Sequence, residues 1–149
     1  MSPNSFTFLQ YLNTVFDNIK DSVMLIGVEP GGKLRLLLAN KRFHELSGYG
    51  KRFIGQNLYE FIGKEHHTQM KKRHNKLMRI KKPMSYMVWS KVPRRGQVAF
   101  EVDMIPVLNT VDDVVQIIVL SRDVTKVATL KERVRKLKAA LVKARPADN

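Results

Sequence analysis

Residues 39–49 read Ala39-Asn40-Lys41-Arg42-Phe43-His44-Glu45-Leu46-Ser47-Gly48-Tyr49, and this stretch decides the fold. Asn40 is a residue type that accepts a hydrogen bond from an early helix amide, so it predicts an N-cap. Phe43 and Leu46 lie three residues apart and share one helix face, which predicts that both pack against a core. Gly48 tolerates the left-handed backbone that ends a helix. The stretch therefore predicts a short helix opened by Asn40 and closed at Gly48.

The segments before this helix predict two strands and an amphipathic helix. Residues 23–28 and 34–39 are β-rich apolar runs, and the connection Glu29-Pro30-Gly31-Gly32-Lys33 has hairpin chemistry. Upstream, residues 5–20 carry apolar side chains at spacings of four, three and four, at Phe8, Leu12, Val15 and Ile19. This apolar stripe needs a partner, either a second copy of the chain or the outer face of the sheet.

The segments after residue 49 predict further helices and then three strands. Short turns or helices are expected at 51–53 and 57–62, and a longer helix at 64–80 is ended by Lys81-Lys82-Pro83. Strands are expected at 84–92, 97–107 and 114–122. Because the strands come in two blocks and do not alternate with helices, the sequence predicts an α+β fold with an antiparallel sheet.

The last segment has a heptad pattern of apolar residues. It places Val127, Leu130, Val134, Leu137 and Leu141 at alternating spacings, which favours a parallel two-stranded coiled coil. However, Arg133 and Lys138 would face each other across such a homodimer and repel. There are therefore three alternatives to a coiled coil for this helix: it packs on its own domain, it binds an acidic partner, or it depends on a further helix downstream.

Composition bounds the function. A chain of 149 residues with 44% hydrophobic residues is sized for one domain, and the absence of cysteine excludes disulfides, zinc thiolates and thiol catalysis. Its apolar runs are too short for a bilayer span and its start lacks the order of a secretion signal, so a cytoplasmic protein is expected. The sequence contains no recognisable nucleophile with a base, no phosphate-cradling glycine loop and no carboxylate cluster. It therefore predicts that the protein is not an enzyme and has no metal site.

Positive charge is concentrated in one segment. The formal net charge is +14, and residues 64–82 hold eight Lys or Arg against one acid. Their densest run contains Lys71, Lys72, Arg73 and Lys76, which predicts, as an alternative function, binding of nucleic acid or an anionic membrane. Nucleic acid is the less favoured partner, because interleaved aromatic residues and a helix-turn-helix spacing are both missing.

Three segments together resemble the PAS family. Residues 40–49 resemble its N-x-x-F-x-x-x-x-G-Y segment, residues 54–58 its I/L-G-x-x segment, and Arg122-Asp123-Val124-Thr125 its R-D-I/V-T segment. The resemblance covers residues 12–126. It implies a five-stranded antiparallel sheet in the order 2-1-5-4-3, with short helices on one face that enclose a pocket. We expect flanking helices at 1–21 and 127–149 around a PAS domain at 22–126.

The resemblance also implies what the pocket can hold. A flavin photoadduct needs a cysteine where this chain has Leu58, so it is excluded, and a coumaryl group fails for the same reason. Non-covalent flavin would contact Asn57 and Trp89. Haem would use the helix position that falls on Met70, with His66 and His74 one turn either side. The cofactor is left unknown, and an empty pocket or a small metabolite is expected.

The same resemblance predicts a signalling role. In PAS proteins the Asp and Thr of the last segment link the sheet to the output helix, which assigns this role to Asp123 and Thr125. Alternatively, Asp123 only caps the trailing helix. The expected function is a sensory or dimerisation module of bacterial-type signal transduction, as in two-component systems. The expected partners are a second copy of the chain and an effector such as a histidine kinase or a cyclic-dinucleotide enzyme.

Overall fold

The computed structural model describes residues 3–145, so the outermost parts of the two flanking segments, residues 1–2 and 146–149, lie outside the described residues. The elements follow the order α1 (Pro3–Asn18), β1 (Ser22–Glu29), β2 (Lys33–Ala39), α2 (Lys41–Ser47), η1 (Lys51–Phe53), α3 (Leu58–Phe61), η2 (Lys64–His66), α4 (His67–Ile80), β3 (Met84–Val92), β4 (Gly96–Leu108), β5 (Val114–Asp123) and α5 (Thr125–Ala144). Each predicted helix and strand is present. The predicted helix at 64–80 is divided into a 3-10 turn and α4.

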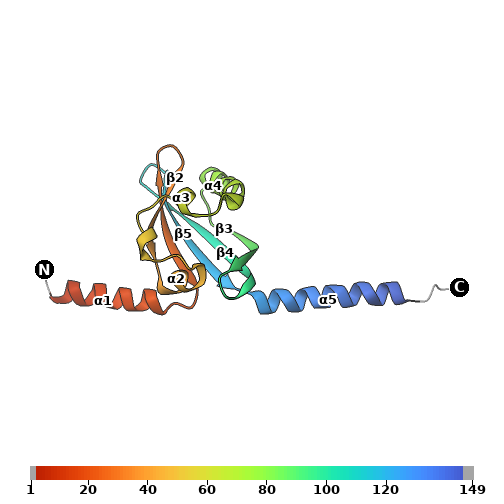
Figure 1. Cartoon of the computed structure of the whole chain (residues 1–149). Coiled ribbons are helices and arrows are strands. Elements are labelled where there is room, and N and C mark those ends of the chain that lie inside the picture. Colours follow the sequence, from red (N-terminus) through yellow and green to blue (C-terminus); the bar gives the residue numbers. More distant parts are fainter. Residues whose placement is uncertain (1–2, 146–149) are drawn as a thin grey trace.

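The five strands form one antiparallel sheet in the order β2-β1-β5-β4-β3 (Figure 1). This confirms the predicted fold and strand order. The central strand β5 pairs with β1 from Ser22↔Ser121 onward and with β4 from Phe100↔Asp123 onward. Strand β2, which precedes the helical segment, and strand β3, which follows it, are therefore the two edges of the sheet.

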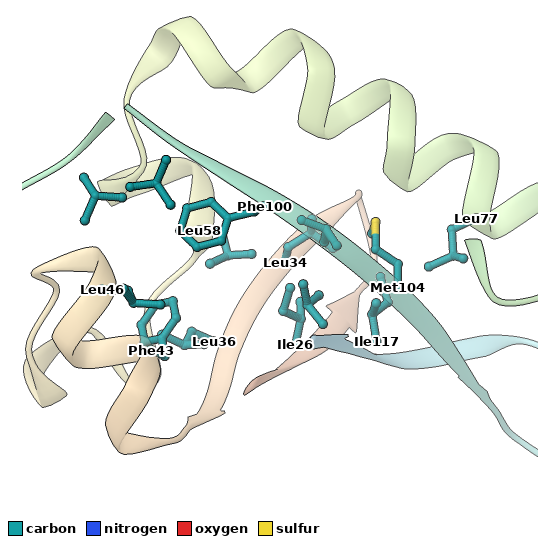
Figure 2. Close-up of a cluster of buried hydrophobic side chains, with 14 of the residues drawn as sticks. Ile26, Leu34, Leu36, Phe43, Leu46, Leu58, Leu77, Phe100, Met104 and Ile117 are labelled. Atoms are coloured by element: carbon teal, nitrogen blue, oxygen red, sulfur yellow. The ribbon is translucent and has the colours of Figure 1, made fainter. Parts of the chain in front are cut away.

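The core lies between one face of the sheet and the short helices (Figure 2). The sheet contributes alternate residues of its strands, because successive side chains point to opposite faces. The helices contribute Phe43 and Leu46 from α2, Leu58 from α3 and Leu77 from α4, all buried. The predicted burial of Phe43 and Leu46 is confirmed.

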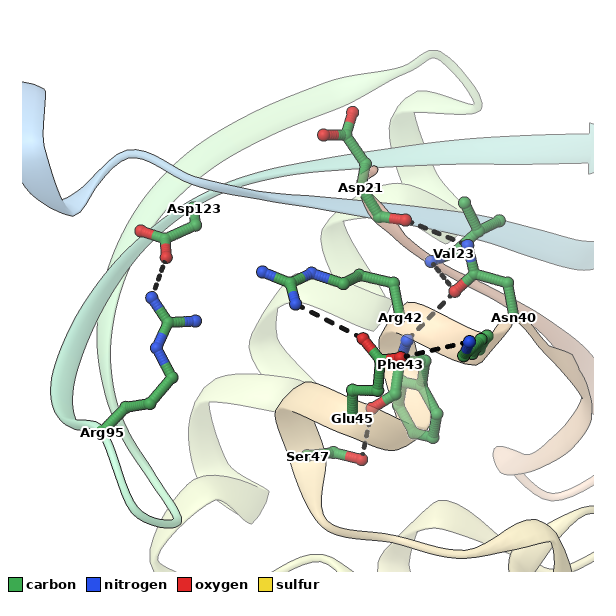
Figure 3. Close-up of polar contacts among 10 residues, drawn as sticks. Asp21, Val23, Asn40, Arg42, Phe43, Glu45, Ser47, Arg95 and Asp123 are labelled. Carbon is green, nitrogen blue, oxygen red and sulfur yellow. Dashed lines mark hydrogen bonds and ion pairs between the residues drawn. The ribbon is translucent and has the colours of Figure 1, made fainter. Parts of the chain in front are cut away.

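Asn40 joins three elements (Figure 3). Its side-chain oxygen accepts hydrogen bonds from the amide nitrogens of Phe43, at 3.1 Å, and Val23, at 3.0 Å. Its side-chain nitrogen donates to the carbonyls of Phe16, at 3.2 Å, and Asp21, at 3.0 Å. The predicted N-cap is confirmed, and the same amide also ties the end of α1 and the start of β1 to α2.

The two flanking helices extend away from the domain in opposite directions (Figure 1). The predicted stripe of α1 stays exposed, with Phe8, Leu12, Val15 and Ile19 between 38% and 61% accessible. Within this chain these exposed side chains of α1 do not cover the outer face of the sheet. The C-terminal end of α1 is held by Asn40 and by Asp17, whose carboxylate accepts from the Lys41 amide.

The heptad residues of α5 are exposed as well. The five predicted positions, Val127, Leu130, Val134, Leu137 and Leu141, are at least half accessible, and Ala128 in the first turn is buried. The alternative that the tail packs along its own domain is therefore wrong for all but this first turn, since the helix leaves the sheet there.

Candidate functional site: a pocket beside β3 and a junction at the base of α5

A pocket of about 310 Å³ lies between the helices and the inner face of the sheet, next to the edge strand β3. This volume is at the lower end of the range of roughly 300–1,000 Å³ found for small-molecule sites. Apolar and aromatic side chains make most of its wall: Met24, Phe43, Leu46, Tyr49, Ile62, Met70, Tyr86, Val88, Val92, Pro93, Phe100 and Val102. The site therefore suits a small ligand with an apolar body.

Local sequence patterns place the walls of this pocket. Strand β3 alternates, so that Tyr86 and Val88 face inward while their neighbours face solvent. On the helical side, Met70 and Arg73 lie three residues apart on one face of α4. The β3 wall thus presents apolar Val88 and Tyr86 with its hydroxyl, and the α4 wall presents apolar Met70 and Arg73 with its guanidinium.

The polar groups of the pocket are hydroxyls, one imidazole and the side chains of an arginine and a lysine. Ser22, Ser47, Ser90 and Ser121 contribute to its lining together with His66, Arg73 and Lys91, and no Asp or Glu does. The guanidinium carbon of Arg73 lies 3.6 Å from the centre of the Tyr86 ring. Burial raises the pKa of Tyr86, and the positive charge of Arg73 acts in the opposite direction.

Two of the three residues predicted around a haem position line this pocket. His66 and Met70 are in the wall, whereas His74 is not, although it lies one further turn along α4. His74 is only 6% exposed, and its Nδ1 atom has no hydrogen-bond partner within residues 3–145. Burial lowers the pKa of this imidazole. The structure therefore separates His74 from the other two.

Asn57 and Trp89, predicted as flavin contacts, do not line the pocket, and the structure corrects both placements. The side chain of Asn57 caps α3 by accepting a hydrogen bond from the Tyr59 amide at 3.2 Å. Trp89 is 46% exposed on the opposite face of the sheet, since the alternation of β3 turns it outward. There it lines a groove of about 780 Å³ between α5 and β3, with Met87, Val127 and other residues.

Asp123 and Thr125 meet at the base of α5. Figure 3 shows the further partner of Asp123, Arg95, which the sequence did not reveal. The Asp123 carboxylate accepts from the Thr125 amide, at 3.0 Å, and hydroxyl, at 2.6 Å, and pairs with Arg95 at 2.5 Å. Thr125 Oγ1 in turn accepts from the Ala99 amide at 3.0 Å. We call Arg95, Asp123 and Thr125 the junction, because they connect the β3–β4 hairpin, β4 and α5.

The junction favours an ionised Asp123. Burial raises the pKa of this carboxyl, but the hydrogen bonds from Thr125 and the ion pair with Arg95 outweigh burial and hold its pKa below the usual value. The N-cap position of α5 falls on Val124, without a capping side-chain bond, so the prediction that Asp123 is the cap is wrong. The role of Asp123 as a link between sheet and helix stays a prediction.

The basic run of α4 does not act as one surface. Lys71, Lys72 and Lys76 are exposed, and none of them forms an ion pair with another described residue. Arg73 is only half-buried and turns toward the pocket, which separates it from the three lysines. Arg73 therefore leaves the predicted polyanion surface, whereas the exposed cations Lys64, Arg79, Lys81 and Lys82 remain part of it with the three lysines.

The described part of the chain has neither a membrane-spanning helix nor a metal-binding cluster. No helix among residues 3–145 is long and apolar enough to cross a membrane. No group of three or more His, Asp or Glu residues in the same range is placed to hold a metal ion.

Comparison with known proteins identifies the family. A family model described as a PAS domain matches residues 20–126. The chain belongs to the PAS domain family. PAS domains are signal-sensing modules, and no curated protein matches this chain by sequence.

Solved PAS structures share the fold at low sequence identity. An RNA-binding light-oxygen-voltage receptor has 16% identity and a TM-score of 0.71, covering 93% of this chain and 40% of the receptor. A PAS domain of a Colwellia psychrerythraea protein has 17% identity and a TM-score of 0.62, covering 80% and 98%. A sensory box sensor histidine kinase from Vibrio cholerae has 16% sequence identity and a TM-score of 0.58. The match covers 82% of this chain and 96% of the kinase chain. This chain therefore spans two-fifths of the first of these proteins.

Proposed function

We propose that this PAS domain senses a small molecule in the pocket beside β3 and relays its presence through the junction to α5. One observation carries the proposal: a single hairpin serves both sites. Ser90, Val92 and Pro93 line the pocket, and Arg95, two residues further on, pairs with Asp123 at the base of α5. A ligand that shifts this hairpin would change the direction in which α5 leaves the sheet.

The flanking helices are the proposed output. Segments 1–21 and 127–149 form a homodimer through their exposed apolar stripes, around a sensory domain at 22–126, and pass the signal to an effector. A histidine kinase or a cyclic-dinucleotide enzyme suits this role, and the similarity to a sensor histidine kinase structure supports the first. The proposed location is the cytoplasm, and the proposed role is regulatory, without catalysis.

The proposed ligand is a small metabolite. Two similar structures are described as light-oxygen-voltage proteins, but here Leu58 stands where their cysteine would be expected, which excludes a photoadduct. Haem lacks support from geometry, because Met70 and not a histidine stands between His66 and His74 on α4.

A spin-label experiment tests the relay. The chain has no cysteine, so Ala139→Cys, on an exposed position of α5, accepts one label per chain. We expect an intermolecular distance distribution that changes when Arg95→Gln breaks the junction. The matched control Arg94→Gln, next to it in the same turn and exposed, should leave the distribution unchanged. Identical distributions for all three proteins would contradict the relay.

A second candidate function rests on the exposed lysines of α4. Lys71, Lys72 and Lys76 offer phosphate contacts without competing carboxylates, so weak binding to arbitrary DNA or anionic vesicles is the alternative. Its signature would be an affinity that falls steeply with salt and is lost in the triple Lys→Glu variant.

A further inference from the structure

Arg73 is the one side chain of the pocket whose charge, position and surroundings all favour the same type of ligand. It projects from α4 into the lining and lies over the Tyr86 ring, at 3.6 Å from the ring centre. The guanidinium of Arg73 also hydrogen-bonds to the Tyr86 side chain, and because a guanidinium carries five N–H donors, further donors remain for another partner. Among the described residues, Arg73 forms no ion pair with a carboxylate.

The rest of the lining reinforces this electrostatic preference. The pocket contains Lys91 at its rim and four serine hydroxyls, and no acidic residue belongs to the wall. Glu65, which pairs with His66 at 3.5 Å, is largely exposed, with 73% of its side chain accessible. An anionic group beside Arg73 would therefore meet donors and positive charge on several sides.

The ligand must also bury an apolar body. Phe43, Tyr49 and Phe100 lie in the same wall as Met70 and Val88, and the volume of about 310 Å³ limits the ligand to a small molecule. An inorganic anion would leave this apolar wall without a partner, and a neutral apolar molecule would leave the charge of Arg73 without a counterion. A guanidinium fork fits the two oxygens of a carboxylate.

We infer that the pocket binds a small carboxylate with an aromatic or branched apolar body, and that Arg73, held on Tyr86, anchors the carboxylate. This inference rests on the proposed function, since it names the class of ligand for the same pocket. It also gives the half-buried Arg73 a role distinct from that of the exposed lysines beside it on α4.

A pair of probes of equal shape and different charge tests the inference. Benzoate and benzamide would be titrated into the full ¹⁵N-labelled chain at neutral pH, with the amides of Tyr86, Val88 and Ser90 as reporters. We expect benzoate to bind about tenfold more tightly than benzamide, because a charge-assisted hydrogen bond is stronger than a neutral one. Arg73→Gln should remove that preference.

The matched control is Lys72→Gln, which removes the same charge from the neighbouring, exposed position of α4 and should keep the preference. Arg73→Lys keeps the charge but loses the planar guanidinium fork, so it should retain part of the preference for benzoate. It replaces Arg73→Gln in the test if that variant does not fold. Equal affinity for both probes, or a preference that survives in Arg73→Gln, would overturn the inference and leave a pocket that accepts neutral ligands. Failure of both probes to shift the reporters would overturn it as well, while the spin-label test of the relay would still decide the proposed function.

Discussion

Asn40 shows how one buried side chain can fix several elements at once. Its amide is fully buried, and all four of its hydrogen bonds go to backbone groups of different segments. The cap was predictable from sequence, because a helix start needs an acceptor at that position. The bonds to Val23 and to the end of α1 were not predictable from sequence, because they depend on how β1 and α1 approach α2.

Replacement of Asn40 by Ala should lower the free energy of unfolding by about 2–4 kcal/mol, since it removes an N-cap and leaves buried backbone groups without partners. Urea unfolding followed by circular dichroism measures this loss. Asn57→Ala is the matched control, because Asn57 makes one capping bond on a short helix and its loss should stay below about 1 kcal/mol. Equal losses for both variants would contradict the joining role of Asn40.

The charge on Asp123 should make the stability of the junction depend on pH. Because the folded-state pKa lies below the usual value, ionised Asp123 stabilises the fold above the unfolded-state pKa of about 3.9, and this contribution is lost as pH falls through the folded-state pKa. The difference in unfolding free energy between wild type and Asp123→Asn should therefore be constant above about pH 5 and shrink below about pH 4.

Asp112→Asn provides the control for this titration. Asp112 is exposed in the β4–β5 loop and makes no ion pair among the described residues, so its replacement should give no comparable trend. If wild type and Asp123→Asn had equal free energies of unfolding at neutral pH, the stabilising role of the carboxylate would be contradicted.

Other single residues show where prediction from sequence stops. Asp123 and Thr125 were identified from their motif, whereas Arg95 was not, since only the pairing of Phe100 with Asp123 brings the hairpin turn close to the base of α5. Likewise, the position of Trp89 depends on which face of β3 is buried. A strand at the sheet edge with apolar residues on both faces does not reveal this in its sequence.

At the scale of elements, α5 combines an apolar stripe with unfavourable charge. In a parallel dimer, Arg133 would lie opposite Lys138 of the second copy. Arg133→Glu replaces this repulsion with an attraction and should tighten the dimer several-fold at low salt, less so at high salt. Sedimentation velocity measures the dissociation constant.

Lys136→Glu makes the same charge change on the side of α5 away from the apolar stripe, and it should leave the dimer constant nearly unaltered. A dimer that is indifferent to Arg133→Glu would contradict parallel pairing along α5. It would point instead to α1 as the surface that holds two copies together.

The division of the predicted helix at 64–80 illustrates a limit at the same scale. Periodicity indicated one helix, but the chain forms η2 first and begins α4 at His67. The His67 ring bonds to the Ile62 carbonyl at 2.8 Å and packs edge-on against Tyr59. These contacts join the start of α4 to α3 and the residue that follows it, and a pattern of apolar spacings does not contain them.

For the whole molecule, the sheet order and the helical layer were predictable because three motifs fell in the right order among alternating and helical patterns. The pocket was predictable as a feature of the family, but its wall was not. Arg73 appeared in the sequence as one more cation in a basic run, and only the helix orientation turns it inward. The orientation of the flanking helices was likewise beyond sequence patterns, since both stripes stay exposed among the residues that the structure describes.

Both exposed apolar stripes belong to helices that leave the domain, and the proposed homodimer forms through them. Sedimentation equilibrium of the complete chain at micromolar concentrations tests this claim most directly. We expect a species of twice the chain mass of 17.2 kDa, which dissociates when Leu12 and Leu137 are replaced by Glu. A wild-type chain that stays at 17.2 kDa at every concentration would contradict it.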